Sequence, residues 1–165
     1  MTGPRAGIGY DIHRLAADRR LVLGGVAIEH PTGLVGHSDG DVLLHALMDA
    51  LLGAANLGDL GRHFPSDDPA YAGASSLGLL TRVGALIREA GLAVASLDAT
   101  VIAQAPRMAP HIPRMVAHIA ADIGMDERCV NVKATTTEAL GFTGRGEGIA
   151  AQAICLLFVP PRDSA

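Results

Sequence analysis

Three residues in the first third of the chain carry side chains suited to holding a metal ion. Asp11 and His13 are two positions apart in an extended segment, and His45 lies inside a strongly apolar one. Because a strand has a period of two residues, Asp11 and His13 leave the same face. Three nitrogen and oxygen ligands with a vacant fourth position are typical of catalytic zinc. Asp49, one helical turn after His45, is placed to accept the imidazole N–H. By spacing alone, the more ordinary interpretation is a surface Asp–His pair beside a hydrogen-bonded core histidine.

The segment before His45 gathers further polar residues at the start of a predicted helix. His37, Ser38, Asp39 and Asp41 fall together there, where free backbone N–H groups attract anions. Ser38 and Asp41 have the spacing of a capping box, with Asp in the position of Glu. Ordinary capping and solvation explain the acidic residues as well, and His37 also fits a plain surface position.

A second polar cluster lies in the run Lys133-Ala-Thr-Thr-Thr-Glu138. Thr135, Thr136 and Thr137 follow a predicted strand and offer hydroxyl and N–H groups to a phosphate. Glu138 suits a hard divalent cation that bridges phosphate oxygens. Thr135 and Glu138 also have the spacing of a capping box at the start of a short helix. The glycine loop that follows, 141–148, lacks the spacing and the lysine of a Walker motif.

These residues need a scaffold that brings strand ends and a buried helix together. Alternating and apolar patterns predict strands over 6–13, 97–106, 129–138 and 149–160, and a hairpin over 21–31. They predict helices within 36–61, over 75–91 and over 111–124. The first of these helices is apolar on nearly every side, so we expect it to be deeply buried. The pattern indicates a mixed α/β fold with one layer of helices on a sheet, formed by a single domain over 1–165.

The composition narrows the classes of partner. Hydrophobic residues make up 49% of the chain and charged residues 18%, so we expect part of the apolar surface to be buried between subunits. With 3% aromatic residues and a net charge of −4, the chain has neither a base-stacking surface nor a basic face, which argues against nucleic acid and membrane partners. Cys129 and Cys155 are expected to be buried free thiols, and with no secretory signal at the start the prediction is a cytoplasmic protein.

Five motifs closely resemble the 2-C-methyl-D-erythritol 2,4-cyclodiphosphate synthase family of the non-mevalonate isoprenoid pathway, and the resemblance runs from about residue 6 to residue 158. They are GYDIHRL, GHSDGDVLLHALMDALLGAANLGDLGRHFP, VIAQAPRM, HIPRM and NVKATTTEALGFTGRGEGIA. The resemblance implies a homotrimer whose subunits each have a mixed four-stranded sheet covered on one face by helices. It implies active sites between neighbouring subunits. It also favours the metal interpretation of Asp11, His13 and His45.

The resemblance implies a phosphorus-oxygen lyase reaction. The substrate would be 4-diphosphocytidyl-2-C-methyl-D-erythritol 2-phosphate, whose 2-phosphate attacks the β-phosphorus and expels CMP. A zinc-type ion would be held by Asp11, His13 and His45, and magnesium or manganese by Glu138. An Asp-His-His set also accepts manganese or cobalt, so the resident metal stays open.

The family pattern assigns the remaining roles residue by residue. His37 and Thr136 match positions that stabilise the transition state. The substrate-binding positions are Asp11, His13, His37, Ser38, Asp59, Gly61, Phe64, Asp68, Ala103, Arg107, Met108, Ala109, Thr135, Thr136, Thr137, Glu138, Phe142 and Arg145. Two positions depart from the pattern: Ser66 stands where the family usually has an acidic residue, and Arg107 where many members have lysine.

Two other functions compete with the synthase. One is a metal-dependent phosphoesterase that uses the same three ligands with water as nucleophile. The other is a non-catalytic trimer that binds an isoprenoid diphosphate in a central cavity. For such a cavity we expect Arg145 and Glu147 to project the same way around the three-fold axis, with the apolar segment 149–159 supplying walls.

Overall fold

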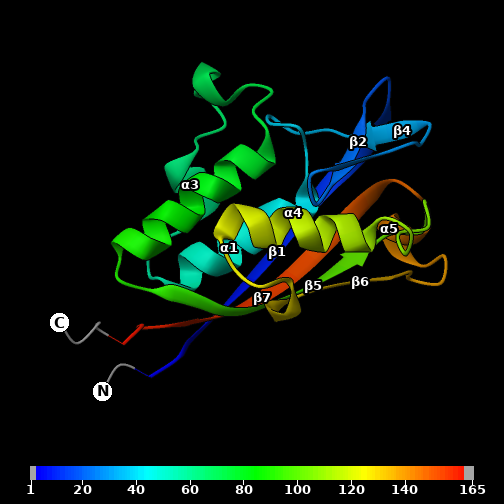
Figure 1. Ribbon diagram of the computed structural model, residues 1–165. Coiled ribbons are helices and arrows are strands. Elements are labelled where there is room, and N and C mark those ends of the chain that lie inside the picture. The colour runs from blue at the N-terminus through cyan, green and yellow to red at the C-terminus, as the bar shows by residue number, and fades with distance from the viewer. Residues whose placement is uncertain (1–2, 162–165) are drawn as a thin grey trace.

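The computed structural model describes residues 3–161, which form a five-stranded sheet with helices on one face (Figure 1). The strand order is β4-β1-β7-β5-β6, antiparallel throughout except for the parallel pair β5–β6. The ends of the predicted domain, residues 1–2 and 162–165, lie outside the described residues. The strands are β1 (Arg5–Ala17), β4 (Thr32–Leu34), β5 (Ala93–Ile102), β6 (Val130–Thr135) and β7 (Gly148–Phe158).

The expectation of four strands is wrong by one. Thr32–Leu34 forms the short strand β4, which pairs with Leu15–Ala17 at the end of β1. The predicted hairpin is present as β2 (Leu21–Leu23) and β3 (Val26–Ile28), in a separate two-stranded sheet. The mixed α/β class and the helical layer on one face are confirmed.

Three helices form the layer over the sheet, and short helical turns connect them. The long helices are α1 (Val42–Ala54), α3 (Ser76–Glu89) and α4 (Ile112–Ile123). The short ones are α2 (Leu60–His63), α5 (Gly141–Gly144) and the 3₁₀ turns η1 (Pro69–Tyr71) and η2 (Glu127–Cys129). The expected glycine loop at 141–148 therefore begins with one helical turn. None of the helices in residues 3–161 has the length and apolar composition needed to cross a membrane.

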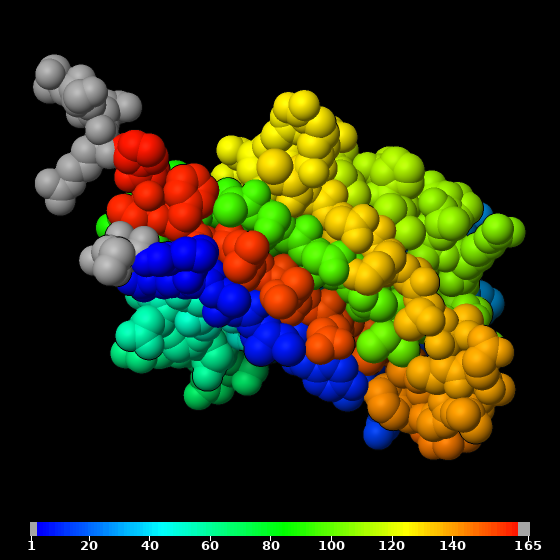
Figure 2. Space-filling view, turned by 90° about the horizontal axis from the view of Figure 1, so that it is seen from below, coloured from blue at the N-terminus to red at the C-terminus, as the bar shows by residue number. Residues whose placement is uncertain are grey.

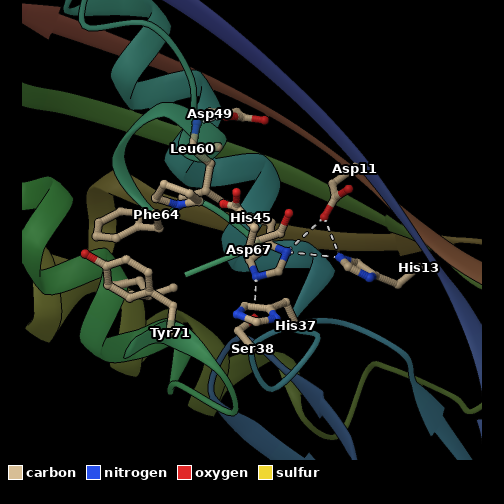
Figure 3. A pocket seen from close by; sticks show the side chains of 14 residues that line it. Asp11, His13, His37, Ser38, His45, Asp49, Leu60, Phe64, Asp67 and Tyr71 are labelled. Atoms are coloured by element: carbon tan, nitrogen blue, oxygen red, sulfur yellow. Dashed lines mark hydrogen bonds and ion pairs between the residues drawn. The ribbon is translucent and has the colours of Figure 1, made fainter. Parts of the chain in front are cut away.

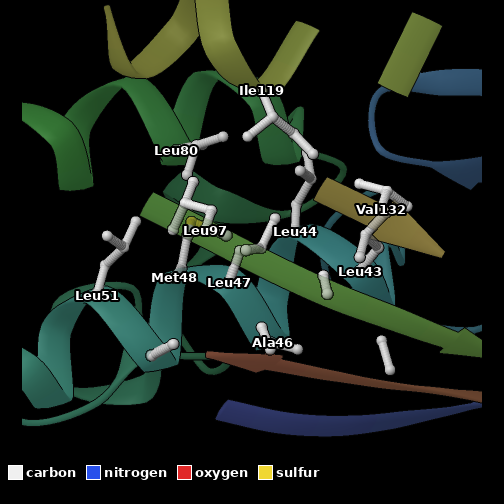
Figure 4. Packing of buried hydrophobic residues seen from close by; sticks show 14 of the residues in the cluster. Leu43, Leu44, Ala46, Leu47, Met48, Leu51, Leu80, Leu97, Ile119 and Val132 are labelled. Carbon is white, nitrogen blue, oxygen red and sulfur yellow. The ribbon is translucent and has the colours of Figure 1, made fainter. Parts of the chain in front are cut away.

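Helix α1 packs directly onto strand β1 through glycines. A Cβ at Gly9 would lie 1.9 Å from the Ala46 carbonyl oxygen, and one at Gly7 would lie 2.0 Å from that of Ala50. Only glycine leaves room for the helix backbone at such a distance. The leucines of α1 fill the space between the sheet and the other helices (Figure 4). This contact brings His45 on α1 next to Asp11 and His13 on β1.

The opposite face of the sheet carries apolar side chains that no helix covers. On β1 this face includes Ile8, whose exposed fraction is 67%, and Tyr10, at 53%. Its other exposed apolar residues are Ile12, Ile154, Leu156 and Phe158. Figure 2 looks onto this face, with the blue β1 and the orange-red β7 side by side at its centre.

The two cysteines differ from each other. Cys155 is buried, donates to the Ala50 carbonyl at 3.2 Å, and has its pKa raised by burial to about 11. Cys129 is exposed, which contradicts the expectation that both thiols are buried, because the turn η2 places it at the surface before β6.

Candidate active site

Asp11, His13 and His45 converge on one point at the base of a cavity (Figure 3). Asp11 Oδ2 lies 2.8 Å from His13 Nε2 and 3.0 Å from His45 Nδ1. The two ring nitrogens are 3.0 Å apart. Strand β1 supplies two of the groups from one face, as the two-residue spacing predicts, and α1 supplies the third.

The hydrogen bonds behind the triad show what its atoms can bind. His13 Nδ1 lies 2.6 Å from the Val35 carbonyl oxygen, which only accepts, so Nδ1 donates and the lone pair of neutral His13 is on Nε2. His45 Nε2 is occupied by hydroxyl groups, which leaves Nδ1 free. Two imidazole nitrogens and a carboxylate oxygen thus face one another at contact distance, and a divalent cation fits that donor set.

The charges of the triad reinforce one another. Burial favours a higher pKa for Asp11, but hydrogen bonds and charge interactions with His13 and His45 outweigh it and hold this pKa well below its usual range. Burial also opposes the charged form of His13, yet the hydrogen bond and charge of Asp11 raise the pKa of His13 above its ordinary value. The pocket is therefore built to keep an anionic oxygen beside a positive charge.

Asp49 does not orient His45, contrary to the expectation from its spacing. Its Oδ1 accepts the backbone N–H of Leu60 at 2.7 Å, because the chain that follows α1 turns back over this carboxylate. The partners of His45 Nε2 are instead Ser38 Oγ at 3.0 Å and Ser76 Oγ at 3.2 Å. Asp49 still lines the cavity.

The predicted capping box is also wrong. Asp41, not Ser38, is the N-cap of α1, and its carboxylate accepts from the backbone of Leu44, Gly24 and Gly25. Burial raises the pKa of Asp41 to about 6, although these three donors work against the rise. Because Asp41 satisfies the helix end, the Ser38 hydroxyl is free to face His45.

The cavity above the triad measures about 640 Å³. It brings together the predicted residues Asp11, His13, His37, Ser38, His45, Gly61, Phe64 and Ser66, and also Asp49, Leu60, Pro65, Asp67, Tyr71 and Leu79. His37 is exposed, and its Nε2 donates to the Asp68 carbonyl at 3.1 Å. His37 thus ties the loop 64–73 to the rim of the cavity.

An aromatic pair within the loop 64–73 also holds this loop in place. The rings of Phe64 and Tyr71 meet edge to face with centroids 5.3 Å apart. The guanidinium of Arg82 on α3 lies 5.4 Å from the Phe64 centroid and 5.8 Å from that of Tyr71. Cation–π contacts of this kind stabilise by roughly 0.5–1 kcal/mol at exposed sites, so both ends of the loop are anchored to α3.

Thr135 and Thr136 of the threonine cluster line a different cavity, of about 370 Å³, whereas Thr137 and Glu138 do not. This cavity is lined by the predicted residues Ala103, Arg107, Met108, Ala109, Thr135 and Thr136, with Gln104, Ala105, Pro106 and Ala134. Within the described part of the chain, no residue lines both cavities. The sheet register runs from Ile12 through Ala150 and Ile102 to Thr135. Three strand spacings of about 4.8 Å place the two sites roughly 14 Å apart across the sheet.

Glu138 is exposed and does not form the alternative capping box. The short helix α5 starts later, after its N-cap Leu140, because Glu138 and Ala139 adopt left-handed backbone angles. Glu138 Oε1 instead accepts the Thr136 hydroxyl at 2.9 Å. Its carboxylate therefore remains at the surface beside the threonines.

The other predicted positions line neither of these two cavities. Asp59 caps α2 by accepting Arg62 N–H at 2.9 Å, and the Asp68 carboxylate accepts Ala70 N–H at 2.9 Å. Phe142 is half-buried in α5, while Thr137 donates to the Leu140 carbonyl. Arg145 is exposed and forms a two-pronged ion pair with Glu147, at 2.7 and 3.2 Å.

Several site residues carried no signal in the sequence. Ser76 stands among small residues at the start of α3, and Tyr71 lies in a loop rich in proline and glycine. Arg82 reaches the site only because α3 packs beside the loop. For Asp39 the sequence predicts only capping and solvation; its carboxylate accepts the Asp41 N–H at 3.2 Å, but it also binds Ser76.

Comparison with known proteins gives consistent matches over nearly the whole chain. Residues 4–158 match the YgbB family. A protein of Thiobacillus denitrificans named 2-C-methyl-D-erythritol 2,4-cyclodiphosphate synthase is 62% identical over 153 residues, 93% of this chain and 96% of that protein. The bifunctional IspDF from Campylobacter jejuni superposes with a TM-score of 0.91 at 43% identity, over 95% of this chain and 42% of that one. IspF of Plasmodium falciparum, solved as a CDP complex, superposes with a TM-score of 0.85 at 32% identity, over 98% of this chain and 99% of that one.

Proposed function

The chain belongs to the YgbB family as an enzyme of the 2-C-methyl-D-erythritol 2,4-cyclodiphosphate synthase type, in isoprenoid biosynthesis, and from this premise we propose its substrate and mechanism. The substrate is 4-diphosphocytidyl-2-C-methyl-D-erythritol 2-phosphate. An oxygen of its 2-phosphate forms a bond to the β-phosphorus, and the bond from that phosphorus to the oxygen bridging to the α-phosphate breaks. The products are the cyclic diphosphate and CMP, which leaves with the bridging oxygen.

The observation that carries this proposal is the convergence of Asp11, His13 and His45 at the base of the larger cavity. Nucleophile and electrophile are both anionic phosphates, so the barrier is mainly repulsion and misalignment. A phosphate monoester is already ionised at neutral pH, so no side chain has to remove a proton from it. A zinc-type ion held by the three ligands would supply charge neutralisation at the β-phosphate.

The chain's own residues orient the rest of the substrate. Ser38 and His37 border the metal ligands and offer hydrogen bonds to phosphate oxygens, with His37 and Thr136 stabilising the developing charge. The loop 64–73 covers the erythritol portion and limits access of water. Ala103, Met108 and Arg107 contribute to the cytidine pocket. Glu138 would hold magnesium or manganese, which would neutralise charge on the substrate's phosphates.

We further propose that the enzyme is a homotrimer and that each active site combines two subunits. The two cavities of one chain are roughly 14 Å apart across the sheet, and this separation supports a site completed by a neighbour's threonine cluster. The uncovered apolar face of β1 and β7 supports burial between subunits, because contiguous exposed apolar patches of this kind mark interfaces.

Incubation of the purified protein with the cytidyl substrate tests the function, with products followed by phosphorus NMR. We expect equal amounts of the cyclic diphosphate and CMP. A linear methylerythritol phosphate in place of the cyclic product would identify a phosphoesterase that uses water, and would overturn the proposed mechanism. Metal analysis of the same preparation identifies the resident ion.

A further inference from the structure

A buried chain of hydrogen bonds links His45 to Asp39 through Ser76. Ser76 is completely buried, and its Oγ lies 3.2 Å from His45 Nε2. The same hydroxyl donates to Asp39 Oδ1 at 2.5 Å, and the Ser76 backbone N–H donates to Asp39 Oδ2 at 2.9 Å. Both carboxylate oxygens of Asp39 are therefore engaged by one residue at the first turn of α3.

The direction of these bonds determines where His45 carries its hydrogen. A hydroxyl has one hydrogen, and that of Ser76 is given to the Asp39 carboxylate. Ser76 Oγ therefore offers only lone pairs to His45 Nε2, which must donate. The lone pair of neutral His45 is then on Nδ1, the atom that faces Asp11 and His13. Ser38 Oγ, at 3.0 Å from Nε2, is a second acceptor for the same hydrogen.

We propose that Asp39 and Ser76 are positioning residues that hold His45 in the tautomer able to bind the metal ion. The inference rests on the proposed metal site and adds two residues to it, neither of which lies among the metal or substrate ligands. Asp41 is the N-cap of α1, and Asp39 Oδ1 contributes there only a longer bond, accepting the Asp41 backbone N–H at 3.2 Å. Outer partners of a metal-bound histidine typically fix its tautomer and its orientation.

The variant Asp39→Asn tests the direction of the bonds while preserving shape. One amide position is now a donor. The Ser76 backbone N–H, 2.9 Å from Oδ2, bonds more closely than the Asp41 backbone N–H, 3.2 Å from Oδ1, so the amide oxygen stays with the Ser76 N–H. The amide nitrogen therefore faces Ser76 Oγ and turns the hydroxyl hydrogen toward His45 Nε2. There it opposes the Nε2 hydrogen and favours the tautomer that cannot bind metal at Nδ1. Ser38 Oγ, 3.4 Å from Ser76 Oγ, is too distant to accept this hydrogen strongly. A carboxylate-to-amide change beside a catalytic histidine acts in this way in serine proteases.

A set of variants separates this role from simple packing. We expect Asp39→Asn to weaken zinc affinity by about 10–100-fold. Ser76→Ala should weaken it less, because Ser38 still accepts from His45. The double variant Asp39→Asn/Ser76→Ala should bind like Ser76→Ala alone, since no hydroxyl remains to be turned the wrong way. Ser75→Ala is the matched control, because exposed Ser75 makes no side-chain capping bond, and it should bind like the wild type.

Zinc affinity is measured on metal-free protein by competition with a chromogenic chelator, and thermal unfolding checks that each variant folds. If Asp39 and Ser76 merely clamp α3 to α1, the double variant will bind zinc at least as weakly as Asp39→Asn, and that result overturns the inference. Wild-type affinity in Asp39→Asn overturns it as well. If Asp39→Asn does not fold, the comparison of Ser76→Ala with Ser75→Ala decides. Equal zinc affinities of these two variants overturn the inference. If the wild type binds no zinc, the proposed metal site fails and the inference fails with it.

Discussion

His45 is the one triad member that comes from the buried helix, so its substitution separates metal binding from folding. We expect His45→Ala to lose zinc binding and turnover, because one of three ligands is removed. The variant should still fold, since α1 is held mainly by its leucines. The measurements are zinc content, product formation and the thermal unfolding midpoint. His30→Ala, which truncates a histidine outside the larger cavity, is the control. Near-normal turnover by metal-free His45→Ala would refute the triad assignment.

The raised pKa of His13 gives metal binding a pH dependence. Asp11 stabilises the protonated imidazole, so the pKa of His13 lies above its ordinary value of 6.5. Below that raised pKa, a metal ion can bind His13 only by displacing a proton. Zinc affinity should therefore fall as the pH is lowered through that range, while the carboxylate of Asp11, with its lowered pKa, stays ionised. Chelator competition across a pH series measures this. In Asp11→Asn the decline should move to lower pH, because the charge that holds the proton is gone.

At the scale of elements, the contact between α1 and β1 sets the geometry of the triad. A methyl group at Gly9 would collide with the Ala46 carbonyl at 1.9 Å, so Gly9→Ala must push the helix away from the strand. We expect a loss of about 1–3 kcal/mol in the free energy of unfolding, as for other overpacked cores, together with weaker zinc binding as His45 retreats. Gly53→Ala on the same helix meets nothing within 4 Å and should stabilise instead. Denaturant unfolding and zinc titration of both variants provide the comparison, and equal effects would contradict it.

How far the sequence predicts these elements depends on whether the signal is local. Periodicity predicts α3, α4 and the long strands, because burial repeats along each of them, whereas α1 is predicted from a nearly continuous apolar run. It does not predict β4, whose three residues carry no pattern and form a strand only by pairing with the distant Leu15–Ala17. The predictions of helix caps and hydrogen-bond partners are wrong for the same reason, because the deciding partners are distant in the sequence. Asp49 has the right spacing for His45, but Leu60 takes its carboxylate and Ser76, 31 residues from His45, takes the imidazole.

At the scale of the whole molecule, the uncovered sheet face allows subunit assembly to be tested separately from metal binding. Ile8 is two-thirds exposed and pairs with Ile154 on β7. A buried, unpaired charge is strongly unfavourable, so Ile8→Asp should shift the protein from the proposed trimer to monomers and reduce turnover, while zinc affinity is retained. Light scattering behind a sizing column measures the assembly. The control Thr81→Asp adds the same charge on the exposed side of α3 and should leave the trimer intact. A trimeric Ile8→Asp would remove this face from the interface.

The composition predicts buried surface between subunits, but it does not say which residues would form that surface. The alternation of Ile8, Tyr10 and Ile12 becomes informative only when the structure shows that helices cover the other side of β1. Arg145 and Glu147 form an ion pair, but they lie in a turn after α5 and not in an extended segment, so the two-residue period does not set their direction. An isoprenoid diphosphate on the trimer axis stays a prediction.

The distance between the two cavities of one chain has a consequence for mixed populations. If each site takes its metal triad from one subunit and Glu138 from the next, inactive subunits of two kinds can repair one another. Neither His45→Ala nor Glu138→Gln homotrimers should turn over, yet trimers reassembled from both should regain activity wherever an intact triad meets an intact Glu138. In a cell that expresses both alleles, two null mutations in the same gene would then complement each other, and a genetic test would count them as separate functions.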